Sequence, residues 1–137
     1  MPAHITLLPH EIDDPVIEKL SHCLAGFSAF DFSLAKIRRF PGGVLYLVPE
    51  PDEPFRRLTR AVWDCCPETP PFGGRYSNVV PHLTVAQLAD EQQAKQIFVE
   101  FERASRGRVP IHATAREITL MDRLSGSWRV RAAIPLS

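Results

Sequence analysis

The spacing of apolar residues switches between two periods along the chain, and this pattern predicts the secondary structure. Alternation of apolar with polar or small residues is typical of strands, whereas apolar residues three and four positions apart are typical of helices. The predicted strands cover residues 3–8, 30–40, 44–50, 82–88, 111–122 and 128–136. The predicted helices lie within residues 13–27, 53–66 and 90–105.

Local signals mark the ends of several of these elements. Pro15 lies in the first turn of the first predicted helix, after an aspartate that can cap it, and Gly26 follows its last apolar residue. The Pro-Gly-Gly sequence at 41–43 joins two strand-like segments and predicts a hairpin. Residues 67–81 are dense in proline and glycine, which predicts a surface loop.

The order of strand, helix and hairpin occurs twice, beginning once at "HITL" (4–7) and again at "HLTV" (82–85). We therefore predict one bilobal domain over residues 1–137, with a first lobe at about 1–66, a loop at 67–79 and a second lobe at about 80–137. The predicted class is α+β, with two pseudo-symmetric lobes of antiparallel sheet and outer helices around a central cleft. In such an arrangement the two repeated strands line the cleft side by side.

Composition narrows the function and the compartment. A chain of 137 residues has the size of one domain, and its 16 basic and 16 acidic side chains cancel, which does not favour a protein that grips long nucleic acid through its net charge. Three cysteines, two of them adjacent, do not form a disulfide framework and fit a reducing compartment. Neither a stretch of 18 apolar residues nor a signal peptide is present, so we expect a cytoplasmic protein without a membrane partner.

The repeated motif carries side chains suited to proton transfer. Residues i and i+2 of a strand share a face, so His4 and Thr6 project together, as do His82 and Thr84. Imidazole exchanges protons near neutral pH, and two imidazoles can divide the work of acid and base. Threonine hydroxyls can donate hydrogen bonds to an anion held between them. This set fits an in-line displacement at phosphorus without a metal.

A third short match, "HATA" at 112–115, serves as an internal control. It has no counterpart in the first half of the chain, since Leu34 occupies the corresponding position, and its flanking residues differ. We therefore interpret His112 as a strand residue on a solvated face. His10 and His22 are also single histidines, for which ordinary surface roles are expected.

With its paired motifs in repeated context, the chain resembles the 2H phosphoesterase superfamily, which includes the bacterial 2'-5' RNA ligases and the RNA 2',3'-cyclic phosphodiesterases. The segments "AHITLL", "FPGGVLYLVPEP", "PFGGRY" and "VPHLTVA" follow one another in the order of the short 2'-5' RNA ligase-like proteins. The resemblance covers essentially the whole chain.

The resemblance implies an enzyme and assigns its residues. His4 and His82 would be the general acid–base pair, and Thr6 and Thr84 would donate to the phosphate oxygens. The reaction would open a 2',3'-cyclic phosphate, or reversibly join RNA ends through a 2'-5' bond, without a metal or nucleotide cofactor. The substrate would be a cyclic nucleotide or a short RNA end, and the balanced net charge favours small substrates over polymer ligation.

The chain departs from its relatives at the N-terminus, where only three residues precede His4 and an additional strand is usual. An uncovered sheet edge is a pairing hazard, so we expect a homodimer formed through that edge. The nearby α-amino group would disfavour the imidazolium of His4. A second hypothesis is therefore a binding module that retains the cleft but has lost turnover.

Two further sets of residues are candidates with alternatives left open. Three rings are placed to stack on a nucleobase, although simple packing is the competing interpretation: Phe40, Phe72 and Tyr76. Three arginines are candidates for phosphate contacts or for salt bridges: Arg75, Arg129 and Arg131. A histidine metal site is the third hypothesis, but the five histidines lack a close ligand spacing and the cysteines form no suitable pair.

Overall fold

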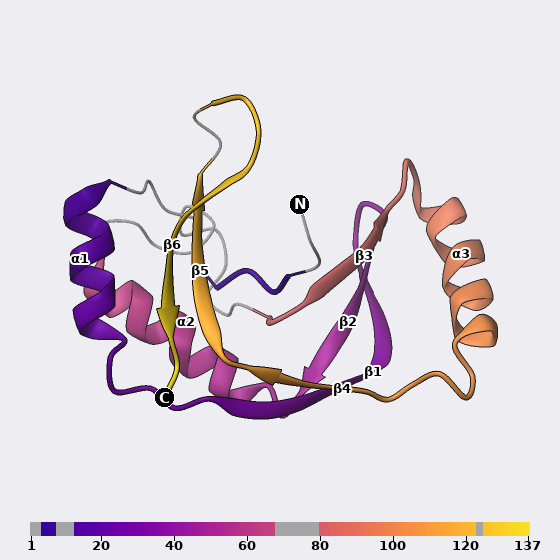
Figure 1. Ribbon diagram of the computed structural model, residues 1–137. Helices are drawn as coiled ribbons and strands as arrows, with labels where there is room; N and C mark the ends of the chain where they lie inside the picture. Colours follow the sequence, from indigo (N-terminus) through magenta and orange to yellow (C-terminus); the bar gives the residue numbers. More distant parts are fainter. Residues whose placement is uncertain (1–3, 8–12, 68–79, 123–124) are drawn as a thin grey trace.

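The computed structural model (Figure 1) describes residues 4–7, 13–67, 80–122 and 125–137. The helices in this part of the chain are α1 (Asp14–Cys23), α2 (Glu53–Cys65) and α3 (Glu91–Ala104). The strands are β1 (Phe30–Phe40), β2 (Val44–Glu50), β3 (Leu83–Gln87), β4 (Ile111–Ala115), β5 (Glu117–Asp122) and β6 (Arg129–Pro135).

Four antiparallel strands form the larger sheet, in the order β3-β2-β1-β4, and β5 and β6 form a separate antiparallel hairpin. Figure 1 shows the two sheets as the limbs of a curled half-barrel, with the segment at 4–7 between them. α1 and α2 lie outside the β5–β6 limb, and α3 lies outside the other limb. The predicted α+β class with antiparallel sheets and outer helices is confirmed.

The β1–β2 hairpin turns where the sequence predicted it and also fixes the end of β3. Gly42 and Gly43 have φ angles of 95° and 92°, a conformation that side chains with a Cβ rarely adopt. A Cβ at Gly43 would collide with the backbone carbonyl of Leu88. The Leu88 N–H donates to the Gly43 carbonyl at 2.8 Å, so the strand that carries the second motif is tied to this turn.

A bulge in β1 explains an irregular step in its apolar pattern. Leu34 and Ile37 are both buried although they are three positions apart, a spacing that regular alternation does not permit. The register against β2 shifts between Leu34 and Lys36, which inserts one extra residue and returns Ile37 to the core face. The bulge therefore lets one long strand keep its apolar side chains buried on both sides of the shift.

One sequence-based prediction requires correction: residues 111–122 do not form a single strand. The segment divides at Arg116 into β4, which pairs with β1, and β5, which pairs with β6 in the other sheet. Alternation continues through both parts, because it reports only which side chains share a face and not which strand is the partner. In Figure 1, β4 lies along the base of the half-barrel, and β5 continues from it up into the other limb beside β6.

Each limb of the half-barrel packs around its own hydrophobic core. One core joins α1 and α2 to the β5–β6 hairpin and includes Leu24 and Leu120; the other joins α3 to the larger sheet and includes Leu45 and Ala94. Both cores combine segments from the two halves of the sequence. The division into lobes at about 1–66 and 80–137 stays a prediction about the sequence repeat.

Helices α1 and α3 begin where an aspartate side chain accepts a hydrogen bond from an N–H group of the first turn. The Asp13 carboxylate accepts from the Val16 N–H at 2.9 Å, and the Asp90 carboxylate accepts from the Gln93 N–H at 2.8 Å. Pro15 lies in the first turn of α1, as predicted. None of the helices in the described ranges has the length and apolar character needed to cross a membrane.

Candidate active site

The two copies of the repeated motif lie on neighbouring segments. Ile5 forms an antiparallel bridge with Leu83. Continued by one residue in each direction, this register sets His4 opposite Thr84 and Thr6 opposite His82. Opposite residues of an antiparallel pair share a face, with Cβ atoms about 5 Å apart, so the two imidazoles and two hydroxyls project to the same side.

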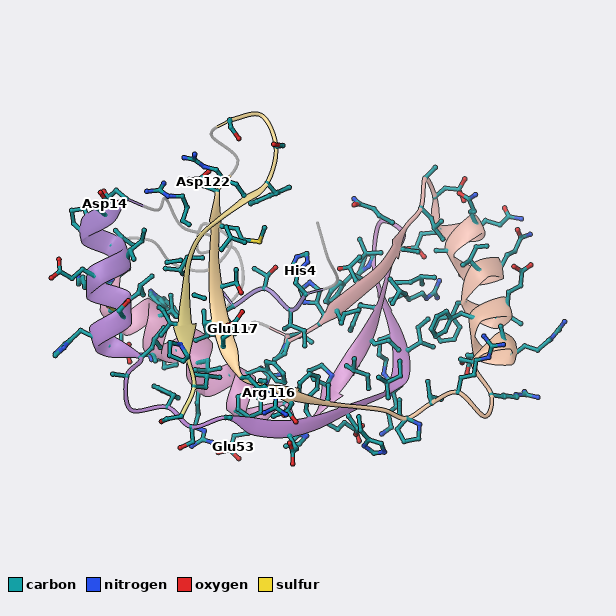
Figure 2. All side chains as sticks on the ribbon, in the orientation of Figure 1. His4, Asp14, Glu53, Arg116, Glu117 and Asp122 are labelled. Carbon is teal, nitrogen blue, oxygen red and sulfur yellow. The ribbon has the colours of Figure 1, made fainter. Side chains whose placement is uncertain are left out.

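The motif pair lies where the two hydrophobic cores meet. Leu7, from the first motif, packs against the core of α1, α2 and the β5–β6 hairpin. Leu83, from the second, packs against the core of α3 and the larger sheet. Figure 2 shows His4 between the two limbs, on the concave side of the half-barrel. One leucine of each motif thus anchors its segment, and the histidine and threonine project to the opposite face.

The ring of His82 is held by its own backbone neighbourhood. Its Nδ1 lies 2.7 Å from the Val80 carbonyl oxygen. A carbonyl oxygen only accepts hydrogen bonds, so Nδ1 must carry the hydrogen. Nε2 is then the ring atom that remains to take up or release a proton.

Two aromatic rings enclose the same imidazole. Phe40 meets His82 edge-on, with ring centroids 5.1 Å apart, and Tyr46 does so at 5.6 Å. Phe40 and Tyr46 are themselves stacked, at 4.1 Å and 22°. Tyr46 is also the partner of Thr84 in the β2–β3 register, so this side of β2 supports both polar residues of the second motif.

Burial determines the state of the Tyr46 hydroxyl. Tyr46 is 7% exposed, and this burial raises the pKa of its phenol, while the positive charge of Arg38 works in the opposite direction. Since the ordinary pKa of tyrosine is about 10, the hydroxyl stays protonated at neutral pH. Tyr46 therefore presents a neutral ring and a hydrogen-bond donor beside His82.

A buried threonine on α2 holds the first motif. The Thr59 hydroxyl donates to the Leu7 carbonyl at 3.1 Å, and Thr59 is only 8% exposed. The segment at 4–7 has a single bridge to β3 among the described residues. The contact with α2 is therefore a substantial part of what positions His4 and Thr6.

The other predicted contact residues fall in different surroundings. Phe40 lies at the site, but its ring is stacked on Tyr46, and its role as a nucleobase platform stays a prediction. Phe72, Tyr76 and Arg75 lie outside the described residues. Arg129 and Arg131 form salt bridges with Asp122 at 3.0 and 2.7 Å, and Arg131 also reaches Asp14 at 3.2 Å. For Arg129 and Arg131 the structure therefore supports a role in salt bridges.

The histidine of the third match lies elsewhere. His112 is exposed on β4, pairs in register with Ser33, and lines a cavity of about 430 Å3 to which no residue of the two motifs contributes. His22 is exposed in the last turn of α1, and His10 lies outside the described residues. Neither the cavity beside His112 nor a groove between β1 and α3 is lined by a motif residue, and the central cleft expected between the lobes stays a prediction.

Two of the three cysteines are buried, and the described part of the chain has no group of metal-ligating side chains. Burial, with the neighbouring thiols of Cys23 and Cys66, raises the pKa of Cys65 to about 12, which keeps that thiol protonated. Cys66 is 1% exposed. Within the described ranges, no three His, Cys, Asp or Glu side chains are grouped to hold a metal ion.

The site contains residues that motif reasoning missed. Tyr46 and Thr59 act on the motif residues through contacts between different elements, whereas the Val80 carbonyl contacts His82 from two residues back along the chain. Tyr46 had a detectable signal, because alternation sets it on the face opposite Leu45 and Leu47. Thr59 and Val80 had none, since each hydrogen bond is accepted by a backbone carbonyl, that of Leu7 for Thr59 and that of Val80 itself for His82, which no pattern of side chains marks.

Comparison with known proteins gives a match between this sequence and one protein family. The family model described as the 2'-5' RNA ligase superfamily matches residues 1–127. A search of curated proteins gave no match.

Proposed function

The chain belongs to the 2'-5' RNA ligase superfamily, and from this premise we propose that it is a metal-independent phosphoesterase that opens 2',3'-cyclic phosphates at RNA ends or on nucleotides. Water attacks phosphorus and forms a new P–O bond, while the bond to the 2' or the 3' oxygen breaks. One proton leaves the attacking water and one proton reaches the departing oxygen. Membership of the superfamily supports a phosphoesterase- or ligase-type enzyme. The choice of a 2',3'-cyclic phosphate as the substrate is part of our proposal.

The observation that carries the proposal is the bridge between Ile5 and Leu83. Its register supports a set of two imidazoles and two hydroxyls on one face, which is the set that an in-line displacement requires. In the proposed mechanism one of His4 and His82 removes the proton from water, and the other protonates the leaving oxygen. Thr6 and Thr84 donate to the non-bridging oxygens, where negative charge increases in the transition state.

The fixed orientation of His82 supports its part in this scheme. With Nδ1 engaged by Val80, the exchange of a proton falls to Nε2, and the contacts with Phe40 and Tyr46 limit rotation of the ring. A ring that is already oriented loses little freedom on the way to the transition state. No nucleotide cofactor enters the proposed reaction, because hydrolysis of a strained cyclic phosphate requires only water as a second reactant.

The test is a panel of 2',3'-cyclic nucleotides and of RNA oligonucleotides that end in a cyclic phosphate, assayed with EDTA present. We expect turnover with EDTA and identification of a single regioisomer, the 2'- or the 3'-phosphate. His4→Ala and His82→Ala should each lower kcat by about 10²- to 10⁴-fold, the usual contribution of a general acid or base.

His112→Ala is the matched control, since it removes an exposed imidazole from the third copy of the motif. It should leave turnover unchanged. Loss of activity in EDTA, or an equal loss in the control and in the two motif variants, would contradict the proposal. Binding of the cyclic nucleotide by calorimetry with no product formed would replace it with the binding-module hypothesis.

A further inference from the structure

A second groove lies away from the motif residues, between β1 and the C-terminal end of α3. Its volume is about 310 Å3. The residues that determine its chemistry are Lys36 and Arg38 on β1, Phe98, Phe101 and Glu102 on α3, and Arg106 just after it.

The groove follows an open edge of the larger sheet. β1 pairs with β4 only over residues Phe30–Leu34, whereas its pairing with β2 continues to Phe40. Between Ala35 and Phe40, the described residues therefore supply β1 with a partner strand on one side only. The other side of this stretch is accessible to a ligand, and the groove is lined by residues of the same stretch.

Positive charge dominates the charged residues of the groove. Lys36, Arg38 and Arg106 contribute three cations against the single carboxylate of Glu102. Lys36 is partly neutralised by Glu50 at 3.3 Å. Arg106 forms no ion pair within the described part of the chain, so its guanidinium is available to an anionic ligand.

Two phenyl rings provide the apolar wall. Phe98 and Phe101 pack against the core beneath the larger sheet, and both are only half-buried. Their remaining surface lines the groove beside the cations. Aromatic rings next to guanidinium groups suit a nucleotide, because a base can stack on a ring while its phosphate meets the cation. An acidic peptide would use the cations but would leave the rings without a matching partner.

Arg38 connects the groove with the candidate active site. It lines the groove, and in the β1–β2 register it lies opposite Tyr46. Tyr46 in turn contacts the ring of His82. An RNA chain whose 3' end reaches His82 would therefore pass Arg38 within a few residues of the reacting phosphate.

We propose that this groove binds a nucleotide of the RNA chain on the 5' side of the reacting end, so that the preferred substrate is an oligonucleotide and not a mononucleotide. This inference rests on the proposed function, since it extends the same substrate beyond the motif residues. It adds a subsite in which Arg106 contacts a phosphodiester and Phe98 or Phe101 supports a base.

The test measures binding of the full-length protein to 5'-labelled RNA that carries a non-reactive 3'-phosphate, by fluorescence anisotropy. We expect the hexanucleotide to bind more tightly than the dinucleotide. Arg106→Gln should weaken hexanucleotide binding several-fold and leave dinucleotide binding unchanged. Loss of one phosphate contact should also lower the slope of log Kd against log salt by about 0.7.

Arg103→Gln is the matched control, because Arg103 is an exposed arginine in the last turn of α3, three positions before Arg106, and does not line the groove. Equal hexanucleotide affinities for the two variants, or no effect of RNA length in the unaltered protein, would overturn the subsite. Displacement of the RNA by a hexaglutamate peptide at equal concentration would identify an acidic-peptide site instead. If the protein binds RNA in a way that depends on Arg106 but shows no turnover, the proposed function is rejected and the groove remains an RNA-binding site.

Discussion

The imidazole of His82 donates its Nδ1 hydrogen to the carbonyl oxygen of Val80, at 2.7 Å. This contact selects one neutral tautomer and aims Nε2 away from the backbone. It is a local interaction, made two residues back along the chain, so it does not depend on the rest of the site being assembled. The orientation of His82 and its chemistry can therefore be separated by mutation.

His82→Asn should retain the donor to Val80 but lose the atom that exchanges protons. We expect kcat to fall by about 10²- to 10⁴-fold, with a thermal unfolding midpoint close to that of the unaltered protein. His82→Leu should lose the same activity and also the hydrogen bond, which contributes about 0.5–1.5 kcal/mol. Steady-state kinetics and thermal unfolding measure the two effects. An asparagine variant with near-normal turnover would exclude His82 from proton transfer.

Tyr46 should act through its ring. Tyr46→Phe retains the stacking on Phe40 and the edge contact with His82, so we expect nearly unchanged kcat. Tyr46→Leu removes both ring contacts, each worth about 0.5–1.5 kcal/mol beyond the buried area, and should lower kcat as His82 gains freedom to rotate. Kinetics of the two variants side by side provide the measurement. A large loss in the phenylalanine variant would show instead that the hydroxyl contacts the substrate.

Thr59 should position the first motif through its hydroxyl. Thr59→Val has nearly the same shape but leaves the Leu7 carbonyl without its donor, a loss of about 1–3 kcal/mol for a buried group. We expect a lower kcat with little change in KM, and recovery in Thr59→Ser, which restores the donor. The matched pair separates positioning from packing. If the serine variant is as impaired as the valine variant, the methyl group and not the hydrogen bond is what matters.

Cys65 should make stability depend on pH in the alkaline range. Burial and the neighbouring thiols raise its pKa to about 12 in the folded chain, against about 8.5 for a free thiol. The folded state therefore favours the protonated thiol. The resulting stabilisation is fully present below the unfolded pKa and is lost as pH rises toward the folded value.

The measurement is chemical denaturation at several pH values between neutrality and the alkaline limit. Cys65→Ser keeps a donor toward the Lys19 carbonyl, which the thiol contacts at 3.6 Å, but does not ionise. Its free energy of unfolding should decline less steeply with pH than that of the unaltered protein. Parallel slopes in the two proteins would show that Cys65 is not the titrating group.

The elements with local signals were predictable from the sequence. The β1–β2 hairpin and the helices α2 and α3 lie within one residue of the predicted ranges, because caps, turns and apolar spacing act over a few positions. The bulge in β1 was visible in principle, since Leu34 and Ile37 are an odd number of positions apart. The division of 111–122 at Arg116 was not visible, because the choice of partner strand depends on the distant β1 and β6.

The candidate site was also only partly predictable from the sequence. The duplicated motif was enough to select His4 and His82, and the bridge at Ile5 brings their segments together. The contacts that position the two histidines could not be predicted from the sequence. The Thr59 hydrogen bond joins residues on α2 and the first motif, and no local pattern encodes which backbone carbonyl a buried hydroxyl will meet. The roles of the motif residues stay predictions until the variants are assayed.

The bridge between Ile5 and Leu83 spans more than half of the chain, which ties the timing of activity to folding. Contacts between residues distant in sequence form late, after the loop that separates them has been closed at an entropic cost. A nascent chain that ends before Pro81 holds one imidazole of the pair and lacks the other. Catalytic competence should thus appear only after synthesis has passed the second motif, and a protein cut between residues 67 and 80 should regain it only if the two fragments reassociate.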